Sequence, residues 1–170
     1  MSKNIVVVAH GKSEVAMWQT FRMRLRTNIC IYSNKNGEEA ITISGLPELF
    51  TGGEMSSEKE IYKRFGEDLD YRPRAREPLP GLKIFTVMDI DGNNRDRRPY
   101  MSGELLKNVP LGKYIVPIYN DNNLDDVMGE MGYSIDTGRP KASAYGDFAR
   151  GVDMVEFYRS LLGNGNTNMD

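Results

Sequence analysis

An acidic pair, Asp89 and Asp91, stands directly after the mostly apolar segment 82–88, which we expect to be a β-strand. The backbone turns where a strand ends, and two aspartates spaced by one residue can then converge on one cation. Their hard oxygen ligands suit Mg²⁺ or Mn²⁺ rather than zinc. The alternative interpretation is an ordinary turn with solvated aspartates. An apolar strand that runs directly into the pair favours the metal site.

A second candidate site spans residues 10–14, between the β-branched segment 5–9 and a helical pattern. Gly11 is typical of a turn, and Glu14 falls in the first turn of the helix, with Ser13 as its expected N-cap. The spacing of glycine and lysine differs from that of a Walker phosphate loop. The competing interpretation is a glycine turn whose glutamate is favoured by the helix dipole.

Basic side chains surround the acidic pair in the sequence, and arginine binds phosphate through two parallel hydrogen bonds. Lys141, expected in a loop before the last helix, adds a charge that can stabilise a phosphoryl transition state. For each group alone, a solvated surface is the simpler interpretation. Together they favour a metal-assisted phosphate site. The arginines are Arg72, Arg74 and Arg76 before the pair, and Arg95, Arg97 and Arg98 after it.

A third polar segment, 120–126, follows another apolar stretch and is rich in Asn and Asp. Turn chemistry and a helix N-cap at Asn122 or Asn123 account for most of it. Neighbouring strand ends lie about 5 Å apart, so Asp125 or Asp126 is a further candidate for the metal shell.

The composition narrows the class of protein. The chain has 170 residues, with 22 Lys and Arg against 24 Asp and Glu, which gives a net charge of −2. It therefore lacks the excess of basic residues that is typical of a protein that coats nucleic acid non-specifically. Its single histidine excludes two-histidine chemistry within one chain. Its single cysteine, Cys30, cannot form an internal disulfide, which favours a reducing, cytoplasmic compartment. The apolar segments are too short for a membrane span.

Strand-like segments alternate with helical patterns, which predicts an α/β fold with a mainly parallel sheet of about four to five strands and helices on both faces. We expect a single domain over residues 1–162 and a flexible tail at 163–170. Ligands of such sheets bind at the carboxyl ends of the strands, where the polar motifs lie. The expected strands are 5–9, 29–32, 40–43, 82–88 and 114–119, and the expected helices include 15–25, 46–50, 56–69, 124–131 and 147–162.

With these motifs in place, residues 4–131 resemble the Toprim domains of topoisomerases, DnaG-type primases and OLD- or RloB-type nucleases. In those domains one strand ends in a glutamate-glycine turn and a later strand ends in Asp-x-Asp. The resemblance rests on Gly11-Lys12-Ser13-Glu14 and Asp89-Ile90-Asp91. It implies a Toprim-like, Rossmann-like fold and Mg²⁺-dependent cleavage of DNA or RNA. It also implies Glu14, Asp89 and Asp91 as metal ligands.

His10 stands where these families place their first glutamate. Since histidine side chains titrate near neutral pH, His10 can act as the general acid or base, alongside Glu14. The first hypothesis is therefore a stand-alone, metal-dependent nuclease, with a separate ATPase or another protein as a partner. The second is a catalytically silent module that binds nucleic acid or nucleotide. A third is a phosphatase similar to the haloacid dehalogenases, with Asp89 as nucleophile, although Asn93 replaces the Thr or Ser of that motif.

Overall fold

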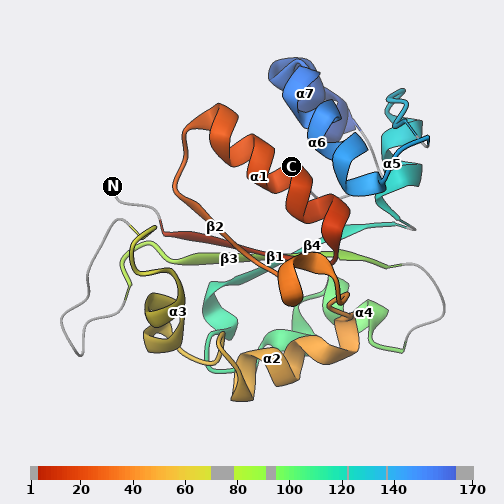
Figure 1. Cartoon of the computed structure of the whole chain (residues 1–170). Helices are drawn as coiled ribbons and strands as arrows, with labels where there is room; N and C mark the ends of the chain where they lie inside the picture. Colours follow the sequence, from red (N-terminus) through yellow and green to blue (C-terminus); the bar gives the residue numbers. More distant parts are fainter. Residues whose placement is uncertain (1–3, 70–78, 91–94, 122, 137, 164–170) are drawn as a thin grey trace.

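The computed structural model describes residues 4–69, 79–90, 95–121, 123–136 and 138–163 (Figure 1). Its centre is one sheet of four parallel strands, which confirms the predicted α/β class. The strands are β1 (Ile5–Ala9), β2 (Ile29–Tyr32), β3 (Lys83–Asp89) and β4 (Ile115–Asn120).

The order of the strands places a crossing point in the middle of the sheet. In the order β2-β1-β3-β4, the chain moves from β1 to one side and later returns to pair β3 with the other side of β1. At such a switch point the two connections leave the sheet in opposite directions and open a crevice at the strand carboxyl ends. The crevice here lies after Ala9 of β1 and Asp89 of β3, which are the ends of the two strands.

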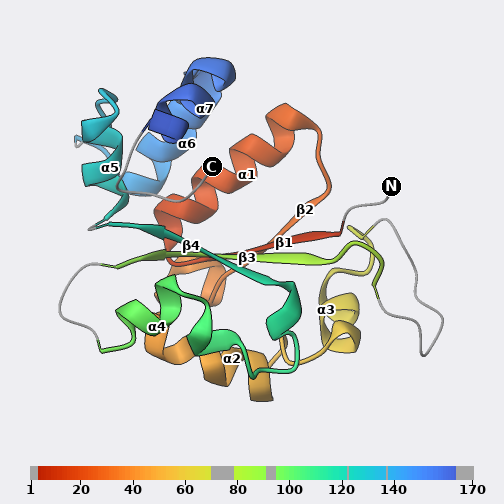
Figure 2. The same ribbon diagram turned by 180° about the vertical axis from the view of Figure 1, so that it is seen from behind.

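Helices cover both faces of the sheet, as predicted (Figures 1 and 2). One face carries α1 (Lys12–Leu25), α5 (Leu124–Glu130), α6 (Lys141–Gly151) and α7 (Met154–Gly163). The other face carries α2 (Leu46–Gly52), α3 (Glu58–Phe65) and α4 (Arg97–Met101). Short 3₁₀ turns occur at Lys35–Gly37, Ile43–Gly45, Glu104–Leu106 and Gly112–Tyr114.

The central strand β1 is apolar on both of its faces. Successive strand side chains point to opposite faces, so Val6 and Val8 pack into the larger core cluster with Phe50 of α2. Val7 packs on the other face with Val87, and Trp18 of α1 lies against that cluster. Burial on both sides explains why this strand is a continuous β-branched run rather than an alternating one.

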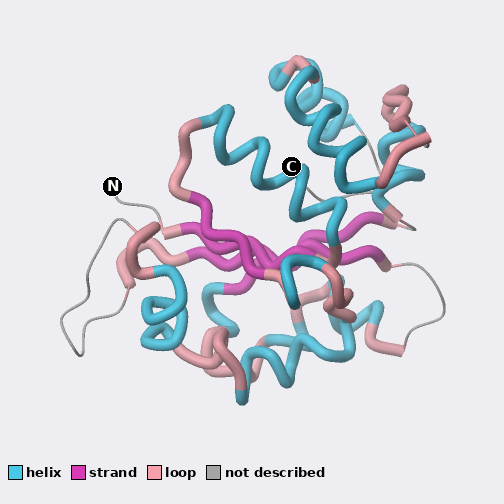
Figure 3. Tube along the Cα trace, viewed as in Figure 1, coloured by secondary structure: helices cyan, strands magenta, loops and turns pink. Residues whose placement is uncertain are grey.

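The segment 40–43, expected as a strand or a strand-like edge, lies outside the sheet (Figure 3). The backbone N–H of Ile41 donates to the carbonyl oxygen of His10 at 2.9 Å. The carbonyl oxygen of Ile41 is taken by the His10 ring, 2.8 Å away. The His10 ring therefore binds the Ile41 carbonyl oxygen, which a neighbouring strand would bind if this segment were paired in the sheet.

One expected helix differs in its bounds from the prediction. The predicted helix 147–162 is divided: α6 begins at Lys141 and α7 starts again at Met154. The break follows from Asp153, whose Oδ1 accepts the backbone N–H groups of Val155 and Glu156, each at 2.9 Å. Lys141 is therefore the first residue of a helix, and the prediction that it lies in a loop is wrong.

Two further local predictions are also wrong. The N-cap of α1 is Gly11 rather than Ser13, so the helix begins two residues earlier than this cap predicts. Arg97 and Arg98, expected in a loop, begin the short helix α4. None of the helices in the described part of the chain is long and apolar enough to cross a membrane. The predicted tail at 163–170 lies, apart from its first residue, outside the described residues.

Candidate functional site

His10 follows β1 directly, and its ring is held in one orientation by the Ile41 carbonyl. Nδ1 of His10 lies 2.8 Å from that oxygen. A carbonyl oxygen only accepts hydrogen bonds, so Nδ1 carries the hydrogen. In the neutral ring Nε2 is then the atom that accepts a proton or binds a metal ion.

Glu14 occupies the third position of α1, where its carboxylate folds back on the helix start. Its Oε2 accepts the backbone N–H of Gly11 at 3.1 Å. This is the carboxylate half of a capping box, and it places a negative charge at the positive end of the helix dipole. The residue is only 4% exposed, so its charge is largely removed from bulk water.

A glycine holds the neighbouring turn against the start of α1. Gly37 has a φ of +85°, and a Cβ at this position would lie 2.9 Å from both N and Cα of Lys12. Only glycine combines this backbone conformation with so close an approach. The turn consequently brings the following residues, including Ile41, beside His10.

Asp89 is the last residue of β3, and its partner across the sheet is Asn120 of β4. The Asn120 side chain is fully buried, and its Nδ2 donates to Oδ1 of Asp89 at 3.0 Å. The backbone N–H of Ile90 donates to the Asn120 carbonyl at 3.0 Å, which continues the strand pairing past Asp89. Asn120 therefore fixes the orientation of the carboxylate. Its sequence signal is a polar residue at the end of an apolar strand.

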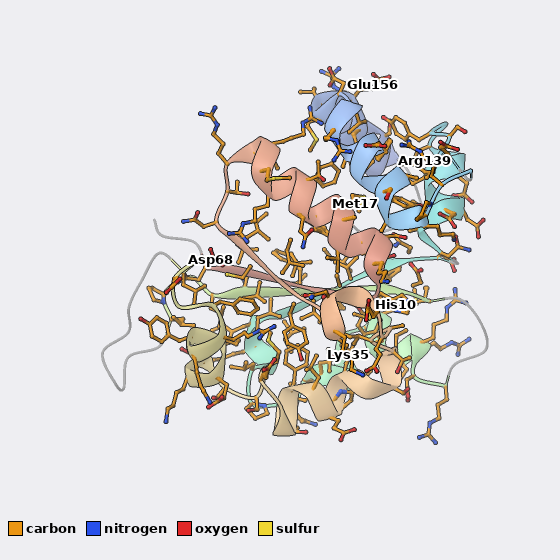
Figure 4. All side chains as sticks on the ribbon, in the orientation of Figure 1. His10, Met17, Lys35, Asp68, Arg139 and Glu156 are labelled. Carbon is orange, nitrogen blue, oxygen red and sulfur yellow. The ribbon has the colours of Figure 1, made fainter. Side chains whose placement is uncertain are left out.

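These side chains meet around one cavity of about 190 Å³ at the crossing point between β1 and β3. His10 lines it from the turn between β1 and α1, Glu14 from the first turn of α1, and Asp89 from the end of β3. In Figure 4, His10 lies beneath the first turn of α1. The fold thus brings Asp89 to the same cavity as His10 and Glu14, although Glu14 and Asp89 are 75 positions apart in the sequence.

The cavity is also lined by Asp125 of α5 and by Lys141 and Tyr145 of α6. Oδ1 of Asp125 accepts the Tyr145 hydroxyl at 2.7 Å, and Oδ2 is in contact with Nζ of Lys141. Burial opposes ionisation of Asp125, but the hydrogen bonds from Lys141 and Tyr145 outweigh it and lower the pKa of that carboxyl. Asp126 instead lies in the first turn of α5, where its backbone N–H donates to the side-chain oxygen of Asn123, the N-cap of that helix.

The pKa of Lys141 is affected by all three carboxylates that line the cavity. The hydrogen bond with Asp125 raises its pKa, burial opposes that shift, and the charges of Asp125, Glu14 and Asp89 add to the rise. Burial contributes most to the raised pKa of Tyr145, and the hydrogen bond with Asp125 and the charge of Asp125 add to it. The sequence contains a signal for this pair, because Lys141 and Tyr145 are four residues apart and share one face of a helix.

The arginines after the acidic pair do not line this cavity in the described part of the chain. Arg97 is paired with Asp121 at the end of β4, with 2.6 Å between its guanidinium and the carboxylate. Arg95 is exposed and lies 3.7 Å from Asp96, and Arg98 is also exposed. Arg95 and Arg98 follow the end of β3 in the sequence. Arg72, Arg74 and Arg76 lie outside the described residues.

The donor set around the cavity suits a hard divalent cation in part. Glu14 and Asp89 supply carboxylate oxygens, the ligand type that Mg²⁺ and Mn²⁺ prefer, whereas the imidazole of His10 is a ligand type of transition metals. Within the described ranges, no three His, Cys, Asp or Glu side chains form a group able to hold a metal ion. Asp91, the third ligand implied by the Toprim resemblance, lies outside those ranges.

Comparisons of the chain with protein-family models, curated proteins and solved structures found no match. The function is therefore inferred from the geometry of the cavity and from the sequence motifs that line it.

Proposed function

We propose that the protein is a Toprim-like phosphoesterase that uses Mg²⁺ or Mn²⁺ to cleave phosphodiesters of DNA or RNA. One observation carries the proposal. His10, Glu14 and Asp89, from motifs far apart in sequence, line one cavity at the crossing point of a parallel sheet. Ligand sites of open α/β sheets are found at this position.

Each side chain of the cavity then has a distinct role. Glu14 and Asp89, with Asp91, would hold the cation, which when bound supplies Lewis-acid stabilisation of charge on the phosphate oxygens. His10 accepts the proton of the attacking water at Nε2, because Nδ1 is committed to Ile41. Lys141 supplies a further positive charge near the phosphate.

The nucleic acid would be gripped outside the cavity. Arg95 and Arg98 are exposed and follow the strand that ends in Asp89. Guanidinium groups on such a surface contact backbone phosphates without regard to sequence, and binding of this kind weakens as salt increases. Arg97 would have to leave Asp121 to do the same.

Cleavage of labelled DNA and RNA with Mg²⁺ or Mn²⁺ tests the proposal. The wild type should cut at least one of the two, and the double variant Asp89→Ala with Asp91→Ala should not. Asp68→Ala is the matched control, since Asp68 pairs with Arg22 at the other end of the molecule (Figure 4). A wild type that cuts neither polymer with any divalent metal overturns the enzyme proposal.

A second candidate is a silent module that binds nucleic acid without cutting it, or serves a partner such as a separate ATPase. The observation in its favour is the engagement of Asp125, whose two carboxylate oxygens already contact Lys141 and Tyr145. Calorimetry with an oligonucleotide separates the candidates, because binding without turnover supports the module. Hydrolysis of a small phosphate ester that is lost in Asp89→Asn would instead favour the phosphatase hypothesis.

We further propose a reducing, cytoplasmic compartment. The support is Cys30, the one cysteine of the chain, which is a free thiol in the core. Burial raises the pKa of this thiol to about 12, so it remains protonated and unreactive.

A further inference from the structure

A second cavity, of about 380 Å³, is lined by residues of the segment after β2 and by helix α2, and the proposed function makes no use of it. Its size is that of a pocket for a small organic ligand. Ile41 and Leu49 supply apolar walls, whereas Gly45, Gly52 and Gly53 add no side chain that would fill the space. A Cβ at Gly52 would meet no atom within 4 Å, so the space beside this residue is open.

Two polar side chains of the second cavity are available to a ligand. The Glu48 carboxylate of α2 and the Asn34 amide form no hydrogen bond or ion pair with other described residues. No lysine or arginine is among the described residues that line this cavity. A phosphate group here would face the Glu48 carboxylate without a compensating cation. The cavity therefore favours a ligand that has no negative charge and that donates N–H groups to a carboxylate.

Ile41 connects the second cavity to the one that contains His10. Its backbone N–H donates to the His10 carbonyl at 2.9 Å, and its carbonyl accepts the His10 ring nitrogen at 2.8 Å. Ile41 lines the second cavity, and His10 lines the cavity at the ends of β1 and β3. A ligand in the second cavity consequently contacts the residue that orients the His10 ring.

We propose that the second cavity binds an unpaired guanine base, and that the Glu48 carboxylate selects it. Guanine carries two adjacent N–H donors, at N1 and at the N2 amino group, and two parallel donors match the two oxygens of a carboxylate. Adenine carries a ring acceptor in place of the N1 donor, and this acceptor repels a carboxylate. The flat faces of a base pack well against apolar side chains such as Ile41 and Leu49.

The inference rests on the proposed function for nucleic acid as the ligand, and it adds which base is bound. Since the N1 and N2 edge of guanine is occupied in a duplex, the substrate is single-stranded at this position. If the chain cuts nucleic acid, the cuts should lie beside guanines. Glu48→Gln should cut with less preference for guanine.

Calorimetry of the full chain with guanosine, inosine and adenosine tests the site without any cleavage. The wild type should bind guanosine most tightly, inosine more weakly because it lacks the N2 amino group, and adenosine most weakly. Glu48→Gln should weaken guanosine binding by about 10- to 100-fold, since hydrogen bonds to a charged acceptor are lost. Glu48 is exposed, so this variant should fold like the wild type.

Glu54→Gln is the matched control. Glu54 directly follows Gly53, but it does not line the second cavity, and its carboxylate lies 3.8 Å from Arg64. The variant removes the same charge from the same region and should bind guanosine as the wild type does. An equal loss of affinity in both glutamate variants would reduce the effect to general charge and overturn the proposal.

The imidazole signals of His10, the single histidine of the chain, give an independent measurement. Saturating guanosine should shift these signals in the wild type, because the ring is bonded to Ile41, and should leave them unmoved in Glu48→Gln at the same concentration. No binding of guanosine, equal affinity for guanosine and adenosine, or unmoved His10 signals at saturation each contradict the guanine site. If guanosine binds as described and no polymer is cut, only the nuclease proposal fails.

Discussion

His10 and Ile41 are joined by two hydrogen bonds although 31 residues separate them. The His10 carbonyl accepts the Ile41 N–H at 2.9 Å, and the His10 ring donates from Nδ1 to the Ile41 carbonyl at 2.8 Å. The pair closes the end of β1 and determines which ring nitrogen is available for chemistry. It gives His10 the defined tautomer that a general base requires.

His10→Asn tests the catalytic role of the ring. The Asn side-chain amide is able to donate to Ile41 in place of Nδ1, so the melting temperature should remain close to that of the wild type. Metal-dependent cleavage should fall by about 10²- to 10⁴-fold, because an amide does not accept a proton from water at neutral pH. The measurement is the single-turnover rate, and an unchanged rate would remove His10 from the mechanism.

Asn120→Asp tests whether the Asn120 amide holds the Asp89 carboxylate in position. The change replaces a buried donor to Asp89 with a second carboxylate, and two like charges at this distance oppose ionisation. We expect a loss of about 3 kcal/mol in the free energy of unfolding at pH 7. Because protonation of one carboxyl relieves the repulsion, the loss should shrink as the pH is lowered.

Urea unfolding at pH 7 and at pH 4.5 measures both parts of this prediction. The conservative control is Asn120→Gln, which keeps the side-chain amide but makes the side chain longer by one methylene group. Equal stability of Asn120→Asp and wild type at both pH values would show that Asn120 does not position Asp89.

The Asp125–Lys141 pair predicts a defined pH dependence of stability. Asp125 has a lowered pKa in the folded chain, so its contribution is present above its ordinary pKa and is lost as the pH falls through the folded value. Lys141 has a raised pKa, so its contribution is present below about 10.5 and is lost as the pH rises through the folded value. The side chains are 41% and 69% exposed, which limits the pair to about 0–1 kcal/mol.

Melting temperatures of wild type and Lys141→Met across the pH range measure this contribution. The difference in melting temperature between the two proteins should be small and constant between the ordinary pKa of aspartate and that of lysine. It should disappear when the pH falls below the folded pKa of Asp125 or rises above that of Lys141. A difference that grows as the pH falls below the ordinary range of aspartate would contradict the assigned signs.

Tyr100→Phe tests the attachment of α4 to the sheet. The Tyr100 side chain is 1% exposed, and its hydroxyl lies 2.7 Å from the Thr86 carbonyl and 2.9 Å from that of Ile118. Its one hydrogen serves one carbonyl at a time, and burial raises the pKa of the phenol, which stays protonated. Loss of the hydroxyl should lower the free energy of unfolding by about 1–2 kcal/mol in urea, and no change would contradict the account.

The elements defined by local pattern were the ones that could be predicted from the sequence. The β-branched run at Ile5–Ala9 and the apolar run that ends at Asp89 appear as adjacent central strands. Asn123 was one of two expected caps of the helix at 124–131, and its side chain does accept the N–H of Asp126. In each case neighbouring residues determine the structure.

The contacts that complete the site depend on residues far apart in sequence. Nothing near Ile41 indicates that its carbonyl will bond to His10 rather than to a strand. Lys141 and Asp125 are 16 residues apart, and their contact exists because α6 begins at Lys141, after a proline that locally suggested a loop. Whether Asp91 joins Glu14 and Asp89 as a metal ligand stays a prediction.

The most direct test of the site uses the single histidine of the chain, which gives one set of imidazole signals in an NMR spectrum. Mn²⁺ broadens the signals of nuclei close to it. If the cation binds between Glu14 and Asp89, the His10 signals should disappear at substoichiometric Mn²⁺ in the wild type and persist in the Asp89→Ala, Asp91→Ala variant. His10 signals that stay sharp in the wild type, or that broaden equally in both proteins, would contradict a metal site at this cavity.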